Sequence, residues 1–73
     1  MKISYDPEVD ALYIRLLEGN YECRSMRLNE EVALNIGPNE ALVGIEIVDA
    51  KRVFRSETIP SLAVENVPLI KTA

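Results

Sequence analysis

Histidine is absent from this chain of 73 residues, and Cys23 is its single cysteine. A disulfide within the chain is therefore excluded, and so is catalysis by a histidine of the chain's own. Because zinc sites are built mainly from Cys and His ligands, we expect no metal and no cofactor. Cys23 has no histidine to activate it as a nucleophile, so we interpret it as a passive thiol on a strand.

Long apolar runs and an excess of basic residues are also missing. No apolar run approaches the ~20 residues that span a membrane, and no basic segment followed by an apolar one marks a signal peptide. With one free cysteine, these absences predict a cytoplasmic protein. The net charge of −4 argues against nucleic-acid binding. The small basic cluster of Lys51, Arg52 and Arg55 has too few charges to indicate such a site.

The sequence contains no glycine-rich phosphate-binding motif and no nucleophile-elbow motif. Asp6, Glu8 and Asp10 have the spacing that opens a calcium loop. Such a loop needs Gly at its sixth position and Glu at its twelfth, where this chain has Ala11 and Leu17. We therefore interpret residues 6–10 as a polar hairpin turn in which Asp6 accepts hydrogen bonds from backbone amides.

Strand-forming residues dominate the middle of the chain. In residues 41–50, Val43, Ile45 and Ile47 alternate onto one face, and Gly44 and Glu46 onto the other. We expect this segment to be the best-buried strand of one small sheet.

Three further segments are predicted to join this sheet. Residues 32–36 alternate cleanly, and the turn formers at 37–40 connect them to the central strand in a hairpin spanning 32–48. Residues 2–5 are predicted to form a short first strand and residues 21–28 an exposed strand.

Residues 7–18 are ambiguous. Val9, Leu12, Tyr13, Leu16 and Leu17 have helical spacing, with Pro and Gly at positions that suit the ends of a helix. The periodicity and these end signals favour a helix over 7–18. A strand over 11–17 instead places Leu12, Ile14 and Leu16 on one face, and Ile14 lies off the apolar stripe of the helix.

The end of the chain is predicted to hold a short helix and an apolar tail. Asp49 can cap a helix over residues 50–55, with Val53 and Phe54 turned to the sheet. Pro60 and Pro68 forbid one continuous helix in the tail. Its large apolar residues are Ile59, Leu62, Val64, Val67, Leu69 and Ile70. We expect an α+β domain over 1–56 and a tail over 57–73 that packs on its own sheet or on a second chain.

Hydrophobic residues make up 48% of the chain, which is high for so small a domain. A fold of this size hides only roughly 60% of the surface of its unfolded chain. Small folds often need a disulfide, a metal or a partner subunit to be stable. With the first excluded and the second unsuited, we expect a homodimer.

Two motifs resemble a known family. Residues 5–16 read YDPEVDALYIRL and residues 42–47 read LVGIEI. Together they resemble a prokaryotic family of small proteins of unknown function, numbered 2283, over about residues 1–52. The chain departs from the family pattern at Glu31, where a Gly is frequent, and at residues 39–40, where an Asp-Gly turn is usual. The resemblance implies an antiparallel sheet of four to five strands, with residues 11–17 as a strand rather than a helix.

The candidate functional residues are Asp10, Tyr13 and Glu46. Glu46 lies among apolar residues and could act as an acid or base, but its place in the alternation predicts a solvent-facing carboxylate beside Arg15 or Arg24.

We expect no enzymatic activity. The first hypothesis is a protein–protein interaction module with a flat apolar surface, and the resemblance adds an antitoxin-like partner of a small toxin. The second is a small-ligand or enzymatic pocket of these three residues at a dimer seam. The third is an autorepressor that binds DNA through Arg52 and Arg55.

Overall fold

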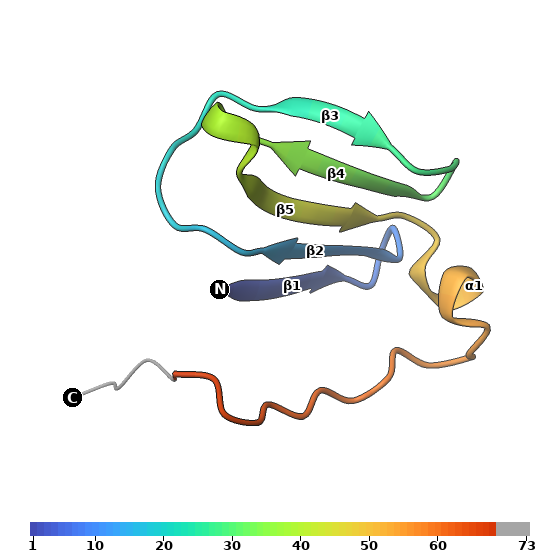
Figure 1. The fold of residues 1–73 in the computed structure, drawn as a ribbon. Coiled ribbons are helices and arrows are strands. Elements are labelled where there is room, and N and C mark those ends of the chain that lie inside the picture. The colour runs from blue at the N-terminus through green and yellow to red at the C-terminus, as the bar shows by residue number, and fades with distance from the viewer. Residues whose placement is uncertain (69–73) are drawn as a thin grey trace.

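The computed structural model describes residues 1–68. It contains one five-stranded antiparallel sheet, a short helix that follows the last strand, and a tail that runs back towards the N-terminus (Figure 1). The elements are β1 (Lys2–Asp6), β2 (Ala11–Arg15), β3 (Arg24–Arg27), β4 (Val32–Ile36), the 3₁₀ turn η1 (Pro38–Glu40), β5 (Leu42–Ile47) and α1 (Ala50–Phe54). The predicted α+β fold with four to five strands is confirmed. Within residues 1–68, no helix has the length and apolar character to cross a membrane.

β5 is the central strand, as its alternation predicts. The strand order is β1-β2-β5-β4-β3, so β5 pairs with β2 on one side and β4 on the other. Val43 and Ile47 are buried, and Glu46 is exposed on the opposite face. The predicted hairpin over residues 32–48 is also confirmed, since β4 and β5 pair antiparallel.

The helix predicted from the spacing of residues 7–18 is wrong, and the strand implied by the family resemblance is correct. β2 pairs along its whole length with β1 and along Leu12 to Arg15 with β5. These long-range pairings outweigh a local helical pattern. Ile14 lies between Ile3 and Ile45 in the paired register, on the apolar face where a strand requires it. β2 ends at Arg15 rather than at Leu17.

The register divides the sheet into two unlike faces. On one face, two apolar rows cross the strands, and we call this surface the apolar face. The first row is Ile3, Ile14, Ile45, Leu34 and Met26, one residue from each of the five strands. The second row is Tyr5, Leu12, Ile47 and Val32. The opposite, polar face carries Ser4, Tyr13, Glu46, Ala33 and Arg27 in one row and Lys2, Arg15, Gly44, Asn35 and Ser25 in the next.

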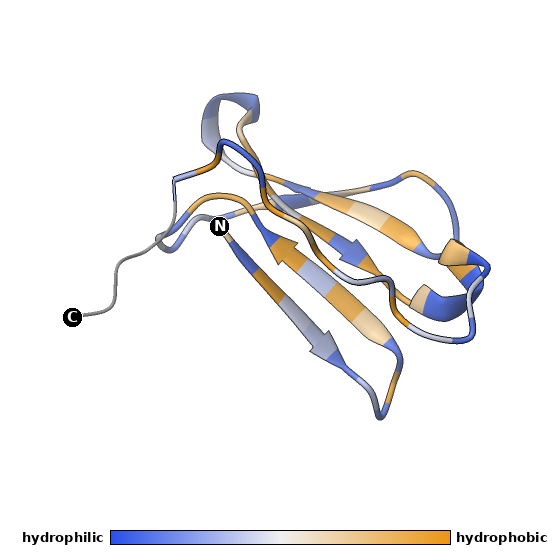
Figure 2. Cartoon of the chain, turned by 90° about the horizontal axis from the view of Figure 1, so that it is seen from below, coloured by the Kyte–Doolittle hydropathy of each residue, from blue (hydrophilic) through white to orange (hydrophobic). Residues whose placement is uncertain are grey.

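The helix and the start of the tail cover only part of the apolar face. Ala50 is completely buried against Leu12 and Ile47, and Val53 and Ile59 pack around this cluster. Figure 2 shows apolar bands along the strands and the tail running from α1 back towards the N-terminus. No large side chain among the described residues is completely buried. The core is therefore shallow.

Several local predictions need correction. The Asp49 side chain makes no cap hydrogen bond, and its backbone is left-handed (φ 49°) where a capping residue is usually extended. Phe54 is exposed rather than turned to the sheet, since the five-residue helix directs only Ala50 and Val53 inward. The exposed strand is β3, shorter than 21–28, so Cys23 lies in the loop before it.

The tail is placed only in part. Ile59 packs against the core, whereas Leu62, Val64 and Val67 are exposed. Leu69 and Ile70 lie outside the described residues.

The loop between β4 and β5 contains a turn at which the sequence departs from the family pattern. Asn39 and Glu40 both have φ of 59°, and the Ala41 amide donates to the Pro38 carbonyl at 3.2 Å. Two consecutive positive φ angles under such a bond define a type I′ turn, which favours Gly at its second central position. Glu40 occupies that position, so the backbone there is strained.

Replacing Glu40 with Gly is expected to stabilise the protein. The matched control is Glu40→Ala, because both variants lose the exposed ion pair with Arg24 and only Gly relaxes the positive φ. The Gly variant should exceed the Ala variant in free energy of unfolding by about 1 kcal/mol in urea denaturation. Equal stabilities for the two variants would show that Glu40 is not strained.

Candidate functional site

The apolar face over β3 and β4 is exposed at β3 and half-buried at β4, where Val32 also packs against the buried cluster around Ala50. Met26 is 40% exposed, and Leu28, just beyond β3, is 60% exposed. Leu34 and Val32 on β4 are half-buried. We call these four residues the open half of the apolar face. A run of exposed apolar side chains on one side of a sheet is typical of a binding surface, whereas single exposed apolar residues are common anywhere.

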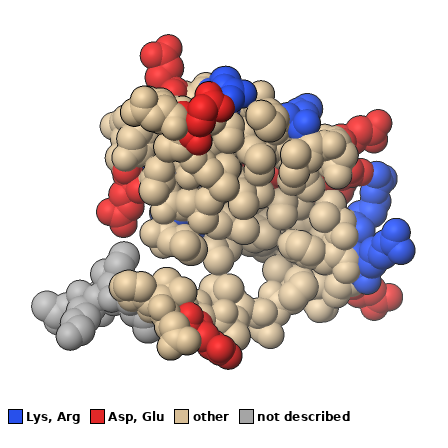
Figure 3. Space-filling model, viewed as in Figure 1, with Lys and Arg blue, Asp and Glu red and all other residues tan. Residues whose placement is uncertain are grey.

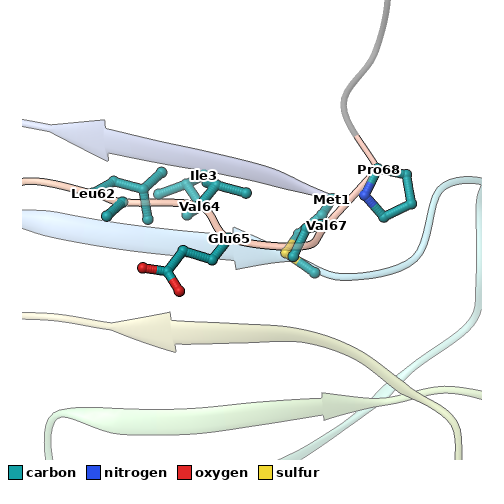
Figure 4. A pocket seen from close by; sticks show the side chains of 8 residues that line it. Met1, Ile3, Leu62, Val64, Glu65, Val67 and Pro68 are labelled. Carbon is teal, nitrogen blue, oxygen red and sulfur yellow. The ribbon is translucent and has the colours of Figure 1, made fainter.

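An apolar hollow lies between the tail and β1, at the other edge of the sheet. Its volume is about 580 Å³, and it is lined by Met1, Ile3, Leu62, Ala63, Val64, Glu65, Val67 and Pro68 (Figure 4). Ile3 belongs to the apolar face, so the hollow continues that face under the tail. Glu65 has the only charged side chain in this lining. The tail therefore leaves an apolar surface exposed between itself and β1.

The molecule exposes more surface than a compact monomer of its mass. The accessible area is 6040 Å², whereas a compact monomer of 8.2 kDa exposes about 4,500 Å². The radius of gyration is 13.6 Å, against about 11 Å for a compact domain of this length. Figure 3 shows a gap between part of the tail and the body of the sheet. The excess area is larger than the ~800 Å² that each partner buries in a standard protein–protein interface.

Asp10 ties the first hairpin to the helix. The Tyr5 hydroxyl donates to Asp10 Oδ1 at 2.7 Å, and the Lys51 amide donates to Asp10 Oδ2 at 3.1 Å. The Ala50 amide donates to the Asp10 carbonyl at 2.9 Å. Asp10 thus supplies, from another part of the chain, the capping contact that Asp49 does not make. The hydrogen bond to Asp10 raises the pKa of Tyr5, and desolvation and the Asp10 and Asp6 charges act in the same direction.

Tyr13 and Glu46 lie opposite each other on the polar face. They line a shallow hollow of about 330 Å³ with Ser4, Tyr5, Asp6, Val9, Ala11 and Leu12. Asp10 is not in this lining. The structure thus brings together two of the three predicted residues. The predicted pairing of Glu46 with Arg15 or Arg24 is wrong, because its cross-strand neighbours are Tyr13 and Ala33.

Tyr13 is held in place by a neighbour that sequence reasoning did not single out. Asn35 Nδ2 donates to the Tyr13 hydroxyl at 3.0 Å. The tyrosine ring crosses Gly44, where an added Cβ would meet the hydroxyl oxygen at 2.2 Å. Gly44 is therefore required by close approach of a side chain. Tyr13 is already engaged in a contact that supports the sheet.

Among residues 1–68, the ion pairs are Arg24–Glu40 and Arg52–Glu31. Glu31, which departs from the family pattern, therefore anchors α1 to the turn before β4. Arg52 is one of the two residues of the DNA hypothesis, and its guanidinium faces Glu31. Within the same residues, no group of three or more His, Cys, Asp or Glu side chains is arranged to hold a metal ion.

Sequence reasoning missed Tyr5, the Lys51 amide and the open half of the apolar face. The hydrogen bonds of Asp10 join residues 41 positions apart, which no local pattern indicates. Met26 and Leu28 did carry a signal, since they share one parity in an otherwise polar segment. Two apolar residues that alternate with polar ones on an exposed strand indicate an apolar face, which is stabilised when other atoms bury it.

The comparisons with known proteins add one finding. A family model described as "Protein of unknown function (DUF2283)" matches residues 2–51. No curated protein and no solved structure matches the chain. The match includes all five strands and the start of α1 and leaves the tail outside.

Asp10→Gly is expected to lower the free energy of unfolding by about 1 to 2 kcal/mol, since it removes a helix-capping carboxylate. Asp49→Gly is a matched control. Both residues have positive φ, 53° and 49°, so Gly suits the backbone at each, and only Asp10 makes the side-chain bonds. Urea denaturation of the two variants measures the difference. Equal effects would show that the Asp10 carboxylate does not hold the helix.

Tyr5 is expected to titrate above the ordinary tyrosine pKa of about 10. The neutral hydroxyl donates to Asp10, so this contact stabilises the fold below pH 10 and is lost as the pH rises through the raised pKa. NMR titration of the Tyr5 ring carbon measures this pKa. In the Asp10→Gly variant, the pKa should fall back towards the ordinary value. A pKa that does not change would mean that Asp10 is not its cause.

Proposed function

Because the chain belongs to the family "Protein of unknown function (DUF2283)", whose description assigns no activity, we propose a function from its surfaces. The protein acts without catalysis, as a protein–protein interaction module. It binds through the open half of the apolar face, defined by Met26, Leu28, Val32 and Leu34.

One observation carries the proposal. A single apolar row crosses all five strands of the sheet, and it is exposed at both ends, at Ile3 and Met26. Burial of apolar area is worth roughly 25 cal/mol per Å², so such a surface gains from being covered. Within residues 1–68, the five-residue helix and the tail leave both ends of this row exposed.

The finer form of the proposal makes the chain an antitoxin-like partner of a small toxin-like protein. The resemblance described above suggests this role, and the net charge of −4 suits a basic partner. Binding of this kind needs no catalytic group. The proposal is supported by the exposed apolar side chains of this face and by the net negative charge of the chain as a whole.

A small-ligand or enzymatic role is the alternative, and the hollow beside Tyr13 and Glu46 favours it. Its volume of about 330 Å³ falls at the lower end of the range for ligand pockets. The two carboxylates that line it, Asp6 and Glu46, come from β1 and β5. The alternative gains if a Glu46→Gln substitution abolishes the binding of a small molecule without changing binding to a protein partner.

Site-specific photo-crosslinking tests the proposal. A photoreactive phenylalanine analogue at Met26 is expected to form a protein adduct in cells that express the full chain. The matched control places the analogue at Ser25, the adjacent residue of β3 on the polar face. Adducts are measured by mass spectrometry after purification.

The proposal expects an adduct at Met26 and at most a trace at Ser25. An adduct with another copy of the chain and an adduct with a different protein both support an interaction module. Absence of any adduct at Met26 above the Ser25 control would overturn it.

A further inference from the structure

The open half of the apolar face and the hollow under the tail lie at opposite edges of the sheet. The hollow under the tail is beside β1, and Met26 is on β3. With strands about 4.8 Å apart, the four steps from β1 to β3 place these surfaces ~19 Å apart. The tail of one chain therefore cannot cover the β3 side of its own sheet while it lies beside β1.

Both surfaces are apolar, and the charged residues beside them have opposite sign. Residues 56–68 of the tail contain Glu57 and Glu65 and no Lys or Arg. β3 contains no Asp or Glu; its Arg24 is on the apolar face with Met26, and its Arg27 is on the polar face. The pairing of Arg24 with Glu40 is highly exposed, so it contributes little and is readily exchanged.

We propose that the occupant of the open half of the apolar face is a second copy of this chain. Met26 and Leu34 of each copy enter the apolar hollow that the tail and β1 form in the other, and Arg24 of each meets the acidic tail of the other. This inference rests on the proposed function, and it names the partner.

A dimer with two-fold symmetry buries both surfaces at once. A rotation about an axis parallel to the strands lays the β1 side of one sheet over the β3 side of its partner, and the reverse, and closes the assembly. The tail of each copy then lies between two sheets, with Ile3 of its own chain on one side and Met26 of the other chain opposite. Sheets packed directly on each other lie ~10 Å apart, so with the tail between them the two sheets of the dimer lie farther apart than this.

The symmetric arrangement also accounts for the surface area. The excess of about 1,500 Å² over a compact monomer is enough for each copy to bury an interface of standard size. It makes use of Leu62, Val64 and Val67, the exposed apolar residues of the tail. A toxin-like partner then competes with the second copy for the same surface.

Intermolecular disulfide formation tests this arrangement. In a Cys23→Ser background, the single-cysteine variants Val64→Cys and Met26→Cys are mixed and oxidised gently, and the mixed disulfide is measured by mass spectrometry. The control mixes Val64→Cys with Ser25→Cys, whose thiol is on the polar face. In a complex, two facing thiols have an effective concentration near millimolar. At micromolar protein we expect at least about tenfold more mixed disulfide for the Met26 pair than for the control.

Light scattering on the Cys23→Ser protein accompanies the experiment and is expected to give twice the chain mass of 8.2 kDa. A monomer mass, or equal crosslinking in the two mixtures, would overturn the second copy as occupant. That outcome leaves the interaction module standing if Met26 still forms an adduct with a different protein in cells. If Met26 forms no adduct at all, the proposed function fails as well, so the two failures are distinguishable.

Discussion

The structure depends on how much of one sheet face a short chain can cover. The apolar rows on β1 to β5 hold most of the large apolar side chains of the strands. Against them the described chain sets only α1 and the start of the tail, which bury Leu12, Ile47 and Ala50. Because so few residues pack on this face, the core is shallow, Met26 is exposed and a hollow remains beside Ile3. A fold that buries so little within itself gains from burying more against another chain.

Polar contacts at one end of the sheet hold α1 against the apolar face. Asp10 receives hydrogen bonds from Tyr5 and Lys51, and Glu31 pairs with Arg52. Together they fix α1 to two different turns, so the helix stays over Leu12 and Ile47 although it is too short to be stable alone. On the polar face, the Tyr13 side chain crosses Gly44, and its hydroxyl accepts a hydrogen bond from Asn35. Asp10 and Tyr13, both singled out from the sequence as functional candidates, are thus engaged in contacts that support the fold.

Much of the fold could be predicted from residue patterns, and the failures have a common cause. The alternation of Val43, Ile45 and Ile47 identifies the central strand because period-2 burial is a local property. The residues of β2 carry both a helical and a strand pattern, and only pairing with β1 and β5 decides between them. The Asp49 cap failed for the same reason, since a carboxylate 39 positions earlier in the chain takes its role. The grouping of Tyr13 with Glu46 follows from strand register, whereas the placement of Asp10 at the helix depends on tertiary contacts that no spacing reveals.

If a second copy completes the apolar face, the stability of the protein depends on its concentration. When unfolding also separates two chains, mass action raises the midpoint as the protein becomes more concentrated. Urea unfolding of the full chain, followed by circular dichroism from about 1 to about 100 µM, should therefore show a midpoint that rises steadily with concentration. A midpoint that is the same at every concentration would mean that the folded unit is a single chain, and would contradict the account.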